Sequence, residues 1–157
     1  MGADTVSPPD EGPYRLAGVT RKLLDAFFDV YHELGSGFLE AVYSNALAIA
    51  LTHAQVEFGR EVLVPISFRG VTVGTYRADF LIASEIVVEL KVANVIDRTH
   101  VAQLVNDLRG SSLELGYILN FGPKPSFKRL IMSNARKNPL RPSAVPNPGA
   151  GRYDRPS

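Results

Sequence analysis

Apolar positions along the chain follow two spacings, and these predict two kinds of element. In three stretches apolar side chains recur every three or four residues, which is the spacing of a helix with one buried face. In the other stretches they alternate with polar residues or run continuously, as in partly or fully buried strands. The predicted elements are helices at 20–34, 38–53 and 98–109, and strands at 56–68, 71–82, 86–92, 115–121 and 127–132. This order predicts an α/β fold, in which the strand after the third helix lies parallel to a central strand.

Local signals mark the ends and irregularities of several elements. Thr20 is predicted to cap the first helix, Gly35 to end it, and Asp97 to cap the third helix. Pro65 cannot donate a hydrogen bond to a neighbouring strand, so its strand is predicted to lie at a sheet edge or to contain a bulge. Gly74 is a second candidate for a bulge. An exposed edge near Pro65 would leave room for a homo-oligomer.

Two charged residues interrupt the most apolar strand. Glu89 and Lys91 are two residues apart, so they point to the same face of the strand, and a buried charge is costly unless it is paired or binds a ligand. If residues 83–85 form a three-residue turn, Asp79 lies directly opposite Glu89. A two-residue turn would move Asp79 to the other face. Two facing carboxylates repel unless a cation lies between them, and oxygen ligands completed by water suit Mg²⁺ or Mn²⁺.

Two motifs resemble those of a known family. Asp79, a strand turn and Glu89-Leu-Lys91 resemble the motif of the PD-(D/E)xK nuclease superfamily. The segment Gly37-Phe-Leu-Glu40-Ala-Val-Tyr43 resembles the signature of the GxxExxY protein family, a bacterial and archaeal branch of that superfamily. The resemblance runs from about residue 20 to 132 and includes Leu34-Gly35, Arg77-Ala78-Asp79, Gln103-Leu104 and Leu119-Asn-Phe-Gly122. It implies a PD-(D/E)xK restriction-endonuclease-like core (αβββαβ), with a mixed sheet flanked by helices and an extra N-terminal helix.

The resemblance also implies a site for metal-dependent hydrolysis of phosphodiester bonds. In this interpretation Asp79 and Glu89 bind Mg²⁺ or Mn²⁺. Lys91 orients the attacking water or stabilises the phosphate as its charge develops. Glu40 is expected to face the two carboxylates, where it binds metal through water or orients the attacking water. Gln103 is expected to orient the site or to contact nucleic acid.

Several of these residues also have simpler interpretations. Glu40 lies in the first turn of its helix, where the helix dipole alone favours a carboxylate. Tyr43 supports Glu40 or contacts a phosphate, or it packs in the core with a hydrogen-bonded hydroxyl. Arg77 is predicted to share the face of Asp79, where it neutralises the acidic cluster or binds a phosphate, or forms only an ordinary salt bridge. Asp107 stands where the related proteins commonly have Tyr, which argues against ordinary activity.

Composition excludes several classes of protein. The chain of 157 residues has no cysteine, so it has neither disulfides nor thiolate metal sites, and its three histidines lack zinc-site spacing. No apolar run reaches the roughly 18 residues that a membrane span requires. The first residues lack the features of a signal peptide, so the cytoplasm is the expected location. The Pro-rich and Gly-rich segments 1–14 and 137–157 are predicted to be disordered, which leaves one domain at 15–136.

Three functions follow from these patterns. The first is a metal-dependent nuclease acting on nucleic acid, with DNA favoured over RNA. The second is a binding or assembly module that kept the nuclease fold without useful turnover, which a net charge of only +1 and Asp107 both favour. The third is a purely structural ion network of Asp79, Glu89 and Lys91 that stabilises one chain or a homo-oligomer.

Overall fold

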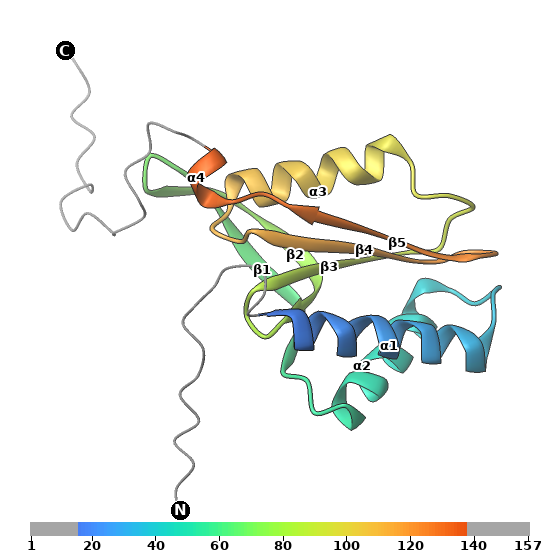
Figure 1. The fold of residues 1–157 in the computed structure, drawn as a ribbon. Coiled ribbons are helices and arrows are strands. Elements are labelled where there is room, and N and C mark those ends of the chain that lie inside the picture. The colour runs from blue at the N-terminus through green and yellow to red at the C-terminus, as the bar shows by residue number, and fades with distance from the viewer. Residues whose placement is uncertain (1–15, 138–157) are drawn as a thin grey trace, which may run out of the picture.

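A five-stranded mixed sheet lies between helices in the computed structural model, which describes residues 16–137 (Figure 1). The helices are α1 (Ala17–Leu34), α2 (Glu40–His53), α3 (Arg98–Gly110) and the short α4 (Asn134–Lys137). The strands are β1 (Phe58–Phe68), β2 (Val71–Ile82), β3 (Ile86–Lys91), β4 (Leu115–Phe121) and β5 (Pro125–Ile131). Helices α1 and α2 cover one face of the sheet and α3 covers the other (Figure 1). The segments predicted to be disordered lie outside the described residues, except for Lys137 at the end of α4.

The strands follow one another across the sheet in chain order, from β1 to β5. All neighbouring pairs are antiparallel except β3 and β4, which are parallel and are connected through α3. The predicted αβββαβ core with an extra N-terminal helix is therefore confirmed. Strand β1 lies at an edge, as Pro65 indicated, and the β1–β2 register shifts between Ile66 and Ser67, next to Gly74. No helix within residues 16–137 combines the length and apolarity that a membrane span requires.

Each face of the sheet has its own apolar core. The core under α1 and α2 includes Leu23, Phe27, Tyr43, Leu47, Phe80, Leu90 and Phe121. The core under α3 includes Val64, Ala78, Val87, Leu104, Leu108 and Ile118. Every residue of β4 is buried, because this central strand is covered on both faces. The continuous apolar run that predicted β4 thus reflects its position between the two layers.

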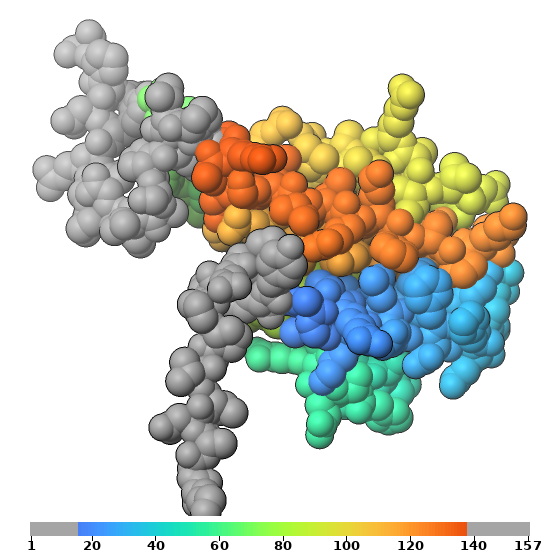
Figure 2. Space-filling model, in the orientation of Figure 1, coloured from blue at the N-terminus to red at the C-terminus, as the bar shows by residue number. Residues whose placement is uncertain are grey.

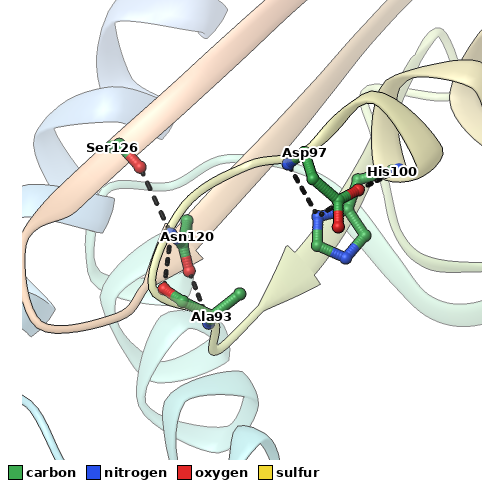
Figure 3. Close-up of polar contacts among 5 residues, drawn as sticks. All are labelled: Ala93, Asp97, His100, Asn120 and Ser126. Atoms are coloured by element: carbon green, nitrogen blue, oxygen red, sulfur yellow. Dashed lines mark hydrogen bonds and ion pairs between the residues drawn. The ribbon is translucent and has the colours of Figure 1, made fainter.

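The two predicted helix caps have different outcomes. Helix α1 begins at Ala17, and the Thr20 hydroxyl donates a hydrogen bond to the Ala17 carbonyl from within the first turn, so the predicted Thr20 cap is wrong. Asp97 does cap α3, as predicted. Its carboxylate accepts from the His100 amide at 2.9 Å, and the His100 ring accepts from the Asp97 amide at 3.3 Å (Figure 3). This reciprocal pair is a capping box that fixes where the segment after β3 turns into α3.

A buried asparagine holds the segment that leaves β3. Asn120 is fully buried, its Oδ1 accepts from the Ala93 amide at 2.9 Å, and its Nδ2 donates to the Ala93 carbonyl at 2.9 Å (Figure 3). The same Nδ2 donates to the Ser126 hydroxyl at 3.3 Å. Close by, a Cβ on Gly122 would lie only 1.8 Å from the Ala93 carbonyl oxygen. The segment after Lys91 is therefore held against the β4–β5 hairpin in two ways. The Asn120 side chain bonds it, and the lack of a side chain at Gly122 lets it pack closely.

Replacing this glycine tests the close approach. Gly122→Ala is expected to lower the free energy of unfolding by about 1–3 kcal/mol, because the new methyl group displaces the backbone at Ala93. Gly74→Ala is the matched control, since nothing lies within 4 Å of its added Cβ. Urea denaturation of both variants measures the difference. Equal stability of the two variants would contradict the proposed packing at Gly122.

Candidate active site

The turn between β2 and β3 sets the register of the site. Residues 83–85 form a three-residue turn, and the first two of them have left-handed φ angles of 50° and 59°. Ile82 therefore pairs with Ile86, as predicted. If the same pairing continued by one more residue, Asp79 would lie opposite Glu89. The regular ladder of hydrogen bonds ends at the pair before it, Phe80 and Val88.

Strand β2 separates from β3 at Asp79. The last regular pair joins Phe80 to Val88. Phe80 packs under α1 and α2, whereas Ala78, two residues away, packs under α3, so the usual alternation of faces breaks between them. Where the ladder ends, the side chain of Asp79 takes the place of a backbone partner, and its Oδ2 accepts from the Leu90 amide at 2.7 Å. The hydrogen bond directs the Asp79 carboxylate into the opening between the two strands.

Glu89 carries the strongest electrostatic perturbation in the site. Burial, the charge of Asp79, a hydrogen bond to the Asp79 carboxyl and the charge of Asp107 raise the Glu89 pKa to about 9, and Lys91 opposes this rise. A glutamate in this position holds a proton at neutral pH when no metal ion is bound beside it. The two carboxyl groups are thus close enough to be held together by either a shared proton or a bound cation.

Glu40 and Lys91 complete the group of charges. Glu40 is the first residue of α2, and its pKa is raised by partial burial and then by Asp79, while Lys91 lowers it. These interactions place Glu40 near both Asp79 and Lys91. The structure therefore brings together Asp79, Glu89, Lys91 and Glu40, four of the residues that the sequence suggested.

Tyr43 does not belong to this group, and its predicted phosphate contact is wrong. Its side chain is fully buried, its hydroxyl donates to the Gly35 carbonyl and accepts from the Phe38 amide, and its ring stacks on Phe121 with centroids 4.5 Å apart. The core interpretation of Tyr43 is confirmed instead. The hydroxyl ties together the loop that precedes Glu40, so Tyr43 acts on the site through the start of α2.

Arg77 and Gln103 lie at the surface. Arg77 is exposed, and within residues 16–137 it has no ion pair with Asp79. Neighbouring side chains in a strand point to opposite faces, so Arg77 points away from the α3 side on which Ala78 packs. Gln103 is exposed on α3, four residues before Asp107, so the two share one face of the helix. Neither residue has a contact that assigns it a role in the site.

Two further residues, Asp107 on α3 and Tyr76 beneath it, lie close to the site although no sequence pattern pointed to them. Asp107 is half-buried, and burial raises its pKa. Tyr76 packs in the α3-side core, and its hydroxyl is buried without a hydrogen-bond partner among the described residues. Burial, followed by the charges of Asp107 and Glu89, raises the Tyr76 pKa. The spacing of Tyr76 could have identified it. Tyr76 lies two residues before Ala78, so both side chains point to the same face of β2, which is the face that α3 covers.

The arrangement argues against a purely structural ion network. Within the described part of the chain, Lys91 forms no ion pair with Asp79 or Glu89. The same residues contain no cluster of three or more His, Asp or Glu side chains that could hold a metal ion unaided. The protein therefore offers two adjacent carboxylates, Asp79 and Glu89, with the rest of any coordination sphere open to water and phosphate. This suits Mg²⁺, which usually keeps several waters and binds through one or two carboxylates.

Comparison with known proteins places the fold. A sequence profile described as the PD-(D/E)XK nuclease superfamily matches residues 17–130, most of the chain. The chain belongs to the PD-(D/E)XK nuclease superfamily. Among solved structures, one titled "Crystal structure of SSO0001" is similar, with 22% identity and a TM-score of 0.48 over 76% of this chain. The match covers 62% of that protein, so this chain spans less than two thirds of its length. A search of curated proteins found no match.

The raised pKa of Glu89 predicts how stability depends on pH without metal. The folded protein binds a proton that the unfolded chain releases between the ordinary pKa of 4.5 and about 9. The stabilisation is therefore complete below the lower value and is lost as the pH rises towards the upper one, at no more than about 1.4 kcal/mol per pH unit.

Glu89→Gln is expected to flatten this dependence and to be more stable than the parent protein near the upper pH. Urea denaturation in EDTA across this pH range measures it. Glu57→Gln, at an exposed position, is the matched control and should retain the parent slope. Identical slopes for the parent and Glu89→Gln would show that Glu89 titrates normally.

Proposed function

We propose that this protein is a metal-dependent nuclease that hydrolyses phosphodiester bonds, with Mg²⁺ or Mn²⁺ bound by Asp79 and Glu89. The observation that carries the proposal is the pair of carboxyl groups held together where β2 and β3 separate, with the Leu90 amide fixing one of them at 2.7 Å. A cation would replace the proton that keeps Glu89 neutral. The carbonyl oxygen of Leu90 is a third candidate ligand beside the two carboxylates.

The residues around this pair suit phosphodiester hydrolysis. A bound divalent cation supplies a Lewis acid and lowers the pKa of a coordinated water. Lys91 provides a positive charge beside the carboxylates, suited to stabilising the phosphate as negative charge develops. Glu40 lies across from them with a raised pKa, which suits a group that accepts a proton from water or positions it.

The loop before α2 supports the assignment to the GxxExxY branch within the superfamily. Gly37 has a φ of 105°, which favours glycine, and the Tyr43 hydroxyl bonds both Gly35 and Phe38 in the same loop. The outer residues of the motif thus fix the loop from which Glu40 enters the site. We further propose DNA in preference to RNA as the substrate, and the cytoplasm as the location.

A binding module without useful turnover is the second candidate function. Asp107 favours it, because this half-buried acid adds a further negative charge near Glu89, which would repel a phosphate. Such a module would bind metal at Asp79 and Glu89 but leave nucleic acid intact. Metal binding without cleavage of single-stranded or duplex DNA and RNA distinguishes it from a nuclease.

Removing one carboxylate tests the metal site and the activity together. The free energy of unfolding of the parent protein is expected to rise in Mn²⁺, by about 2.7 kcal/mol at a hundred times the Kd. Asp79→Asn is expected to lose this rise and all metal-dependent cleavage. Its amide oxygen can still accept from the Leu90 amide, so the strand geometry survives.

Thermal melting with and without Mn²⁺, together with a cleavage assay, measures both effects. Asp29→Asn on the exposed side of α1 is the matched control. Cleavage by Asp79→Asn at the parent rate would show that the site assignment is wrong.

Removing the ammonium separates catalysis from metal binding. Lys91→Met keeps an unbranched side chain and is expected to lower the cleavage rate about a hundredfold or more, because a charge that stabilises the phosphate is lost. The Mn²⁺-dependent rise in melting temperature should persist, since Lys91 is not a ligand. Lys22→Met, on α1, is the control. A parent-like cleavage rate in Lys91→Met would exclude the proposed role.

A further inference from the structure

A concave surface lies between the start of α3 and the β4–β5 hairpin. It has a volume of about 750 Å³ and runs between the segment 94–98 with the first turn of α3 and the β4–β5 hairpin around residues 124–128. We name this surface the basic groove. It is lined by Asn94, Val95, Ile96, Asp97, Arg98, Val101, Ala102, Lys124, Ser126, Phe127 and Lys128. The two segments that form it lie side by side on the right of the space-filling view (Figure 2).

The charge of the groove is positive, although the chain as a whole is nearly neutral. Arg98, Lys124 and Lys128 contribute three exposed cations, and none of them has an ion pair among residues 16–137. Asp97 is the one acid in the lining, and its carboxylate is already bonded to the His100 amide as the helix cap. Three unpaired cations along one concave surface complement a chain of negative charges.

The groove is connected to the candidate site through the chain. The segment that forms one wall begins at Asn94, three residues after Lys91, and Asp97 in this wall interacts electrostatically with Lys91. Asn120 holds this segment through both polar groups of Ala93 and also bonds Ser126 in the opposite wall (Figure 3). A single buried side chain therefore fixes the spacing between the two walls and their position relative to the site.

We propose that the basic groove binds the sugar-phosphate backbone of the nucleic acid on one side of the scissile bond. Arg98 lies on one wall, and Lys124 and Lys128 lie on the other, so a strand between them meets cations on both sides. Contacts of this kind position a substrate and carry no sequence information. The inference rests on the proposed nuclease function and adds a path for the strand that leaves the active site.

The test is binding of a fluorescein-labelled DNA oligonucleotide, single-stranded and duplex, measured by anisotropy over a series of salt concentrations. Ca²⁺ replaces Mg²⁺, because its larger and more flexible coordination keeps a divalent charge in the site without the octahedral geometry of Mg²⁺. The variant is Lys124→Ala/Lys128→Ala. The matched control, Arg21→Ala/Lys22→Ala, removes the same charge from α1 on the other face of the sheet.

The groove variant is expected to bind about tenfold more weakly than the parent, and its salt dependence should be shallower by about two units of slope. The control should bind like the parent. Both variants should keep the Mn²⁺-dependent rise in melting temperature, which shows that the fold and the metal site are intact.

Two results would overturn the proposal in different ways. If the groove variant and the parent share one affinity and one salt slope while the parent still cleaves DNA in Mg²⁺, the groove is not the strand path and the nuclease assignment stands. If the parent neither binds DNA in Ca²⁺ nor cleaves it in Mg²⁺, the groove proposal and the DNA-nuclease assignment both fail.

Discussion

The hydrogen bond from the Leu90 amide to the Asp79 carboxylate is the interaction on which the site depends. It forms where the β2–β3 ladder ends, so a side chain takes the place that a backbone carbonyl would otherwise occupy. Because a side chain replaces the backbone partner, β2 and β3 separate at this point, and the Asp79 carboxylate stays beside Glu89. Two carboxylates held close together repel each other and lose hydration, which lowers the stability of the fold. The apolar cores on both faces of the sheet provide stability that offsets this loss.

Glycines and buried polar groups position the surrounding parts. Gly122 and Asn120 hold the segment after Lys91 against the β4–β5 hairpin, and the Tyr43 hydroxyl holds the loop before Glu40. In both places a residue with no contact to the proposed metal determines where a charged residue lies. The acids and the lysine therefore sit on fixed backbone, which is the condition for preorganised electrostatic catalysis.

The sequence predicted the fold well, because the elements follow from patterns of apolar residues. The register was predicted only on the condition of a three-residue turn after Ile82, which the structure has, and the capping residue Asp97 follows from its own chemistry. The sequence could not decide whether Tyr43 is buried. A tyrosine one helical turn from a glutamate is equally compatible with a position in the core and with a position on a binding surface. The break in alternation beyond Ala78 depends on how β2 pairs with β1 and β3 together, so no local pattern could reveal it.

The most direct test of the central claim is an anomalous difference map from crystals grown with Mn²⁺. The account predicts one peak between the carboxylates of Asp79 and Glu89, about 2.0–2.2 Å from an oxygen of each, the distance typical of a small octahedral divalent cation. The Leu90 amide should still donate to the other oxygen of Asp79. Absence of a peak at this position under saturating Mn²⁺, or a peak only elsewhere on the molecule, would contradict the account.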